Sequence, residues 1–155
     1  MKYILSILCA SILVFACDKI EDPAPINTID TSKTATITGT VTTQLDLSNS
    51  TTENVPAGTV LFFTVNASDY VVNGTATGTQ KLVYTTAVEA NGTYTIAIPA
   101  LTKAISVSIT GDEFAFNQKQ SAGPDIRKVY KINTPASPSI TLGKKTVLDL
   151  SYTGS

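Results

Sequence analysis

The side chains that could carry out chemistry are few in this chain of 155 residues. It contains no histidine, two cysteines, Cys9 and Cys17, and a single arginine, Arg127. General acid–base and nucleophilic catalysis need such groups placed together, with tunable pKa values. The adjacent carboxylates Asp112 and Glu113 would point to opposite sides of a strand, so they do not form a catalytic pair. We therefore predict that the protein is not an enzyme.

The segment before Cys17 has the layout of a secretory signal. One charge, at Lys2, precedes the run from Ile4 to Ala16, in which only two serines interrupt the apolar residues. As a helix, such a span covers roughly 20 Å, well short of the roughly 30 Å hydrocarbon core of a bilayer. Residues 1–16 are therefore predicted to be a cleaved signal peptide rather than a permanent membrane span.

The residues Val14-Phe15-Ala16-Cys17 resemble the lipobox of bacterial lipoproteins, although the phenylalanine departs from the usual pattern. The resemblance implies that the Cys17 thiol is diacylated, that the signal is cut before it, and that the new amine is acylated in turn. Several acyl chains, such as palmitate, would anchor the chain durably, because each buried CH₂ contributes about 0.8 kcal/mol. The alternative is an ordinary secretory signal that ends at a cysteine by chance.

Residues 17–33 are predicted to be a lipidated, flexible tether, because charged, proline and small polar residues dominate and apolar periodicity is absent. Asp18, Glu21 and Asp22 resemble the surface-export signal of Bacteroidota lipoproteins. In enterobacteria, by contrast, an aspartate directly after the cysteine retains a lipoprotein in the inner membrane. We expect the chain at the bacterial outer membrane, lipid-anchored and either periplasmic or surface-exposed.

Beyond Lys33 the chain is rich in threonine, valine, isoleucine and tyrosine, with turn residues between short runs. This pattern is typical of an all-β sandwich. Period-two alternation predicts that Tyr94, Ile96 and Ile98 face inward, and Asn91-Gly92 predicts a hairpin with a type I′ turn. Residues 34–155 are predicted to form one domain, a single antiparallel β-sandwich of about seven strands, near 37–47, 59–65, 80–88, 93–98, 104–110, 126–132 and 146–152.

Four segments of this region, ITGTV, VPAGTVLFFTV, NGTYTIAIP and ISVSITG, resemble in their order the carboxypeptidase regulatory-like, or transthyretin-like, domain. The resemblance covers roughly residues 36–111, and the NGTY hairpin is its most specific part. It implies a sandwich of transthyretin-like or immunoglobulin-like type. These motifs encode turns and core positions, so they imply no chemistry by themselves. Residues 112–155 depart from the short ending typical of the family, and they either complete the sandwich or add to it.

Charge and composition argue against several classes of ligand. Loss of Lys2 with the signal leaves ten basic and twelve acidic side chains, without a basic patch, so no nucleic acid is expected as a partner. No spaced acidic motif of the kind that binds calcium is present, and we expect no metal and no cofactor. The chain lacks tryptophan for stacking on sugars. The tyrosines of the predicted strands are expected to pack in the core: Tyr84, Tyr94, Tyr130 and Tyr152.

Four N-x-S/T sequences could suggest glycosylation, and they begin at Asn49, Asn66, Asn73 and Asn91. General sequon glycosylation is uncommon in bacteria, which the lipobox implies. Asparagine, serine and threonine are also frequent turn residues. We interpret these sequences as turns.

The candidate partner-binding residues follow from topology. If every connection reverses direction, loops near 46–58, 89–92 and 111–125 gather opposite the tether, and those near 66–79, 99–103 and 134–145 lie beside the membrane. Binding residues concentrate in loops held by a rigid scaffold. The spacing of Phe114 and Phe116 favours a short strand with both rings in the core over exposed loop positions, and the alternative for the loops is that they are solvated turns only. The candidate residues are Asp46, Asn49, Glu53, Asp112, Glu113, Phe114, Phe116, Asn117 and Gln118.

The sequence predicts a non-enzymatic envelope lipoprotein that acts as a binding or accessory module for an unknown glycan or envelope protein. A structural or adhesion subunit is the alternative, because fimbrillins of Bacteroidota are also lipoproteins built from transthyretin-like sandwiches. Fimbrillins commonly mature by cleavage after an arginine near the start of the fold and contain two sandwich domains. Here the only arginine, Arg127, lies far along the chain.

Overall fold

The computed structural model describes residues 29–71, 79–133 and 137–155. The predicted signal peptide, Cys17 and most of the predicted tether lie outside the described residues. The described part is all-β, as predicted, with one short 3-10 turn, η1 (Ala67–Tyr70). Nowhere in that part does the chain form a helix with the length and hydropathy to cross a bilayer.

The larger sheet is built around β1, which has strand partners on both of its edges. The order β11-β1-β12-β9-β8 runs along one path, and β2 and β5 pair with the other edge of β1. This sheet contains β1 (Thr34–Thr43), β2 (Glu53–Asn54), β5 (Thr93–Pro99), β8 (Phe114–Gln118), β9 (Ile126–Ile132), β11 (Lys145–Val147) and β12 (Leu150–Gly154).

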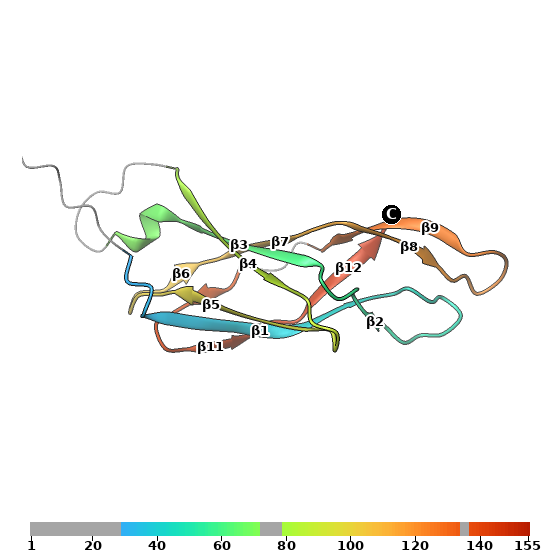
Figure 1. Ribbon diagram of the computed structural model, residues 1–155, viewed down its shortest axis with the longest axis horizontal. Helices are drawn as coiled ribbons and strands as arrows, with labels where there is room; N and C mark the ends of the chain where they lie inside the picture. Colours follow the sequence, from blue (N-terminus) through green and yellow to red (C-terminus); the bar gives the residue numbers. More distant parts are fainter. Residues whose placement is uncertain (1–28, 72–78, 134–136) are drawn as a thin grey trace, which may run out of the picture.

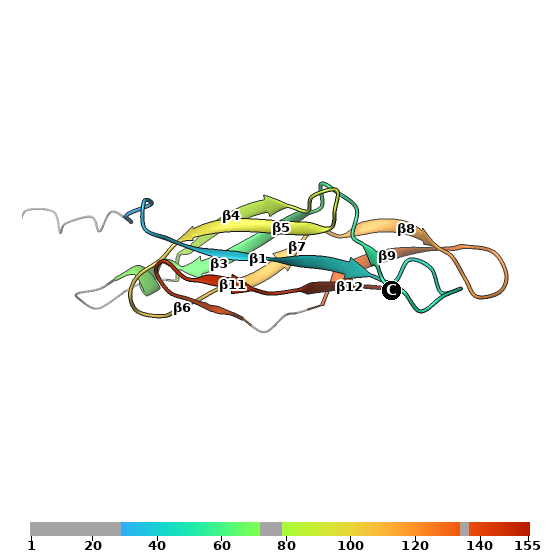
Figure 2. The same cartoon turned by 90° about the horizontal axis from the view of Figure 1, so that it is seen from below.

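The opposing layer has β3 at its centre, so the apolar run in that segment forms a central strand, as predicted. The strand order is β4-β3-β7, and β6, which leads into β7, pairs with β10. The two layers lie face to face as a sandwich (Figures 1 and 2). Its strands are β3 (Val60–Asn66), β4 (Lys81–Ala87), β6 (Ile105–Ser106), β7 (Ser108–Gly111) and β10 (Ser139–Ile140).

The core lies between the layers and consists of the apolar positions that alternate along the strands. Tyr94, Ile96 and Ile98 are buried, which confirms their predicted inward orientation. β-branched and aromatic side chains suit a pleated surface that is buried on one face. The largest fully buried side chains are Tyr94, Tyr130, Phe63, Ile37, Leu61, Ile98, Ile105 and Ile140.

β1 pairs in parallel with two strands from the other end of the sequence, so the expectation that every connection reverses direction is wrong here. Its first half pairs with β11 and its second half with β12. The reason is the route of the chain, which passes from β9 to β10 beside β6 and then returns to β1. Residues 112–155 therefore supply four strands of the large sheet, and they complete the sandwich rather than extend it.

A tight contact at Gly39 explains two of the sequence motifs together. Leu148 and Asp149 interrupt the ladder between β11 and β12, and a Cβ at Gly39 would overlap the Leu148 carbonyl. Tyr94 lies opposite Gly39 in the antiparallel pair of β1 and β5. Its hydroxyl donates a hydrogen bond of 2.7 Å to the same Leu148 carbonyl. The glycine of ITGTV and the tyrosine of NGTY thus meet at one point of the sheet.

The turn at Asn91-Gly92 differs from the predicted type I′ turn. Gly92 has a φ of +80°, as expected, but no residue other than glycine has a positive φ within the described residues. A type I′ turn needs positive φ at both central residues. Gly92 donates its N–H to the Glu89 carbonyl at 2.9 Å, and Glu89 donates to Thr93 at 2.8 Å. The two strands then separate, because β4 pairs with β3 whereas β5 pairs with β1.

The two ends of the molecule carry different loops. The chain approaches β1 at one end, where Ile29 packs against the core and the Lys33 carbonyl accepts a hydrogen bond of 2.8 Å from Ala100. The predicted tether therefore joins the folded domain before its last residue. The connections at 67–70, 99–104 and 141–144 lie at this end, and those at 44–52 and 119–125 lie at the other (Figures 1 and 2).

Candidate partner-binding tip

The structure places the nine candidate residues in three different settings. Asp46, Asn49 and Glu53 belong to or border the loop between β1 and β2, and Asp112 and Glu113 link β7 to β8. The other four, Phe114, Phe116, Asn117 and Gln118, form β8, so the predicted loop 111–125 is wrong over 114–118. The spacing of the two phenylalanines is that of a strand. We call the loop 44–52 and the β8–β9 turn 119–125 the tip.

The two parts of the tip are joined at Lys119. Its N–H donates to the Leu45 carbonyl, and its own carbonyl accepts from the Leu47 N–H, both at 2.9 Å. Asp46 and Lys119 form an isolated parallel bridge, and their side chains form an ion pair of 3.1 Å. The large sheet therefore curls, so that the chain leaving β1 meets the far edge of β8. Topology had predicted this proximity of the two loops, but not the contact itself.

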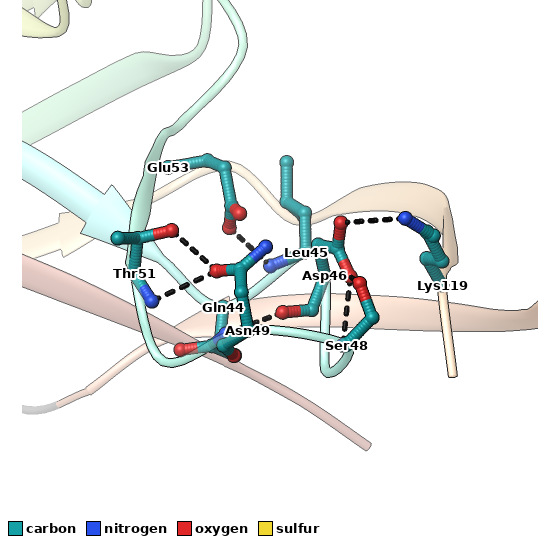
Figure 3. Close-up of polar contacts among 8 residues, drawn as sticks. All are labelled: Gln44, Leu45, Asp46, Ser48, Asn49, Thr51, Glu53 and Lys119. Atoms are coloured by element: carbon teal, nitrogen blue, oxygen red, sulfur yellow. Dashed lines mark hydrogen bonds and ion pairs between the residues drawn. The ribbon is translucent and has the colours of Figure 1, made fainter. Parts of the chain in front are cut away.

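The loop 44–52 is held by side chains that bond to backbone N–H groups two residues further on (Figure 3). The Asp46 carboxylate accepts from the Ser48 N–H at 2.7 Å and from the Ser48 hydroxyl. The Asn49 amide oxygen accepts from the Thr51 N–H at 2.8 Å and from the Thr51 hydroxyl. Both are Asx-turns, in which a side chain replaces a backbone acceptor. The interpretation of the Asn49 sequence as a turn is thus confirmed.

Two further side chains close the loop from within (Figure 3). The Gln44 amide donates to the Asp46 carbonyl at 2.6 Å and to the Asn49 carbonyl at 3.2 Å. The Glu53 carboxylate accepts from the Leu45 N–H at 2.7 Å. The polar side chains of Asp46, Asn49 and Glu53 therefore hold the loop in shape. A partner would meet the preformed loop surface rather than free carboxylates.

β8 presents a buried and an exposed part. The Phe114 ring stacks on Tyr130, with centroids 5.1 Å apart, and is tilted against Tyr152 at 5.5 Å. Gln118 is buried, and its amide donates to the Gln44 carbonyl at 2.9 Å. Phe116, by contrast, is 40% exposed. The expectation that both phenylalanines lie in the core holds for Phe114, which packs against it, but it is wrong for Phe116, which is exposed.

Two of the four charged candidate residues, Asp46 and Glu113, form ion pairs among the described residues. Hydrogen bonds from Ser48, together with the ion pair to Lys119, lower the pKa of Asp46. Glu113 forms an ion pair of 3.1 Å with Lys131 on the neighbouring strand β9. Exposed ion pairs of this kind contribute little to stability. No group of three potential metal ligands occurs within the described ranges.

The exposed chemistry of the tip is a mixture of apolar and neutral polar groups. Leu47 is 41% exposed, and Ile126, the first residue of β9 directly after the tip, is 50% exposed. Asn49, Ser50 and Thr51 are also exposed. Such a surface can bind by shape and hydrogen bonding. Sequence reasoning missed the bonds of Gln44, Ser48 and Lys119, although the D-x-S and N-x-T spacings were a signal for the two Asx-turns.

The comparisons with known proteins assign no relative to this chain. No family model matches it, and no curated protein matches it either.

Proposed function

We propose that the protein is a non-enzymatic bacterial lipoprotein of the outer membrane, whose β-sandwich acts as a binding or accessory module for a glycan or protein partner. The anchor would be acyl chains on Cys17, which follows an apolar run and Ala16. Acyl chains on one residue suffice for stable attachment when more than one is present.

The observation that carries the proposal is the separation of the two ends of the domain. The chain from Cys17 approaches the fold at Ile29, beside the start of β1, and the tip lies at the opposite end (Figures 1 and 2). A lipid-anchored copy would therefore hold the tip away from the membrane. Loops positioned by a rigid scaffold in this way are common sites of recognition.

The character of the tip supports a macromolecular partner rather than a small substrate. Its loop is preformed by Gln44, Asp46 and Asn49, so binding would require little ordering of the loop. Leu47 in the tip, together with Phe116 and Ile126 on the two strands that border it, supplies exposed apolar area. Interfaces of this kind combine an apolar centre with neutral hydrogen-bonding groups.

A structural or adhesion subunit is the second candidate, and one observation favours it. β8 is the last strand of its sheet, and among the described residues only β9 pairs with it along its length. Maturation after Arg127 would not fit this role, because Arg127 lies inside β9 and pairs with Asn117. Cleavage there would divide the large sheet.

Labelling with palmitate tests the anchor. The wild-type chain and a Cys9→Ala control should incorporate the label, and Cys17→Ala should not. Equal labelling of all three would refute the lipoprotein assignment. For the module, replacement of 48–52 and 120–124 by Gly-Ser segments should abolish capture of a glycan or protein from envelope extracts, with a nearly unchanged melting temperature. Capture retained by the folded double replacement would place the binding surface elsewhere.

A further inference from the structure

The outer edge of β8 carries backbone groups that no strand of the described residues uses. Along a strand, successive backbone N–H and C=O groups point alternately to the two edges. Val129 in β9 exchanges backbone hydrogen bonds with Ser155, so its N–H and C=O groups point away from β8. Ala115 lies opposite Val129 in the β8–β9 pair. The N–H and C=O groups of Ala115 therefore point away from β9. Lys119 has the same parity and bonds to the loop 44–52. Ala115 and Asn117 therefore present their N–H and C=O groups at the open edge.

This edge lacks the usual protection against pairing. Edge strands of soluble proteins commonly carry proline, lysine, a bulge or an inward charge. β8 reads FAFNQ, without proline, glycine or charge, and Phe116, Ala115 and Asn117 are exposed. Charges stand only at its two ends, with Glu113 before the strand and Lys119 after it. The opposite signs at these positions decide which partner the edge fits.

We propose that the partner of this edge is β8 of a second copy of the chain, paired antiparallel about Phe116. In that register Ala115 of each copy lies opposite Asn117 of the other. Both residues direct their N–H and C=O groups to the open edge, so each pair could exchange two backbone hydrogen bonds. Phe116 lies opposite Phe116 at the position where side chains are closest, which suits an aromatic pair. Glu113 comes beside Lys119 at both ends.

The arrangement is a two-fold, self-complementary interface, as in most homodimers. A parallel in-register pair would instead place Glu113 beside Glu113 and Lys119 beside Lys119. The ladder is short, because the loop 44–52 already occupies the outward groups of Lys119. The charged residues at its ends then meet through their side chains alone. A single contact of this size is weak, and many copies in parallel would be needed for a durable connection.

The direction of β8 determines how two anchored copies meet. β8 is antiparallel to β9, which is antiparallel to β12, which is parallel to β1. β8 therefore runs in the same sense as β1, away from the end at which the chain enters the domain (Figures 1 and 2). In an antiparallel pair the two entry points lie at opposite ends. Copies joined in this way would bridge two facing membranes, which makes the protein a homophilic adhesion module.

The pairing is tested with differently tagged full chains at high concentration in detergent, with photochemical cross-linking before capture because a single contact is weak, and it does not depend on lipidation. Wild-type chains should capture each other, and Asn117→Pro should abolish capture, whereas Asn117→Ala should not. Glu113→Lys or Lys119→Glu alone should weaken self-capture about tenfold, because each puts like charges together at both ends. A mixture of Glu113→Lys with Lys119→Glu should recover it, since opposite charges meet again. Absence of wild-type self-capture, or no recovery in the mixture, would overturn the proposal.

The bridging arrangement rests on the anchor of the proposed function, so it is tested separately. Wild-type chains in vesicles of phosphatidylethanolamine and phosphatidylglycerol should cluster separate vesicle populations, and Asn117→Pro chains should not. Self-capture in detergent without clustering of vesicles that carry the chain would contradict the facing arrangement. Chains that do not enter vesicles would contradict the lipid anchor, and the capture experiment in detergent would then decide whether the β8 strands pair.

Discussion

The carboxylate of Asp149 takes the place of a backbone acceptor beside Thr40. It accepts hydrogen bonds from the Thr40 N–H and from the Thr40 hydroxyl, both at 2.8 Å. These bonds bridge the interruption between β11 and β12, where the Thr40 N–H bonds to a side chain instead of a backbone carbonyl. They also lower the pKa of Asp149. A side chain thus keeps the parallel part of the large sheet continuous.

Acid should therefore weaken the fold in part through Asp149. Its pKa is lower in the folded state than the ordinary value of 3.8, so its stabilising effect is complete above that value and is lost as the pH falls through the lowered pKa. Measured by urea unfolding, the free energy of unfolding should fall less with decreasing pH across this acid range for Asp149→Asn than for the wild type. Asp125→Asn serves as the control, because the Asp125 carboxylate takes part in no ion pair among the described residues. Equal pH slopes for both variants would contradict the role of Asp149.

Gly39→Ala should destabilise the fold, because the added Cβ would overlap the backbone carbonyl of Leu148. A backbone atom cannot move aside as a flexible side chain can. Crowding of this kind costs about 1–3 kcal/mol. Chemical denaturation checks the value, and Thr36→Ala, on the outer face of the same strand, should stay within about 0.5 kcal/mol of the wild type. A Gly39→Ala chain as stable as Thr36→Ala would show that the backbone at Leu148 can move to accommodate the added Cβ.

Removal of the hydroxyl from two buried tyrosines should have opposite results. The Tyr94 hydroxyl donates to Leu148, so Tyr94→Phe should cost about 1 kcal/mol, whereas Tyr94→Ala should cost about 3–5 kcal/mol. The Tyr152 hydroxyl is buried without a hydrogen-bond partner among the described residues. Tyr152→Phe should therefore be neutral or stabilising in the free energy of unfolding. A loss at Tyr152 equal to that at Tyr94 would reveal a hidden partner.

Alkaline conditions should expose the burial of Tyr152. Burial, and to a smaller extent the charge of Asp112, raises its pKa from 10.0 to about 12. The neutral phenol is favoured in the fold, so its contribution is present below pH 10.0 and is lost as the pH rises through about 12. Measured by urea unfolding, the free energy of unfolding should fall less with increasing pH along this range for Tyr152→Phe than for the wild type. The same slope in both chains would contradict the burial of the phenol.

The tip loop should loosen without loss of the fold when Asp46 is replaced. Asp46→Ala removes the bonds to Ser48 and to Lys119, so the amide of Ser48 should exchange its hydrogen faster. Amides of β1 and β5 should keep their protection, because the core is untouched. Hydrogen exchange followed by NMR measures both, with Ser50→Ala as the matched control in the same loop. Unchanged exchange at Ser48 would mean that the Asx-turn does not hold the loop.

The sequence was most informative where a local pattern decides the structure. Alternation placed Tyr94, Ile96 and Ile98 inward, because side chains of a strand alternate between faces. Gly92 was correctly placed in a left-handed conformation, whereas Asn91 was not. Asparagine tolerates positive φ but does not require it, and a three-residue turn with one such glycine closes the connection equally well.

Non-local features could not be read in the same way. β8 has only five residues between polar segments, so its alternation is too short to favour a strand over a loop in a prediction from sequence. The parallel pairing of β1 with β11 and β12 depends on the path of the chain through the other layer. For the tip, topology predicted that 46–53 and the region near 119 lie close together. The bonds that use Asp46, Asn49 and Glu53 internally depend on loop conformation, which the residue types alone do not determine.

The parallel contact between β1 and the strands β11 and β12 has a consequence for export. β1 has no partner in β3 or β4, and its longest ladder, with β5, begins some fifty residues later in the chain. Apart from the two-residue pairing with β2, its remaining ladders form only with residues 145–152. Contacts between residues this far apart in the sequence form slowly, because ordering the intervening chain costs conformational entropy. A nascent chain would thus stay unfolded until nearly all of it has been synthesised, which is the state that the proposed export would require.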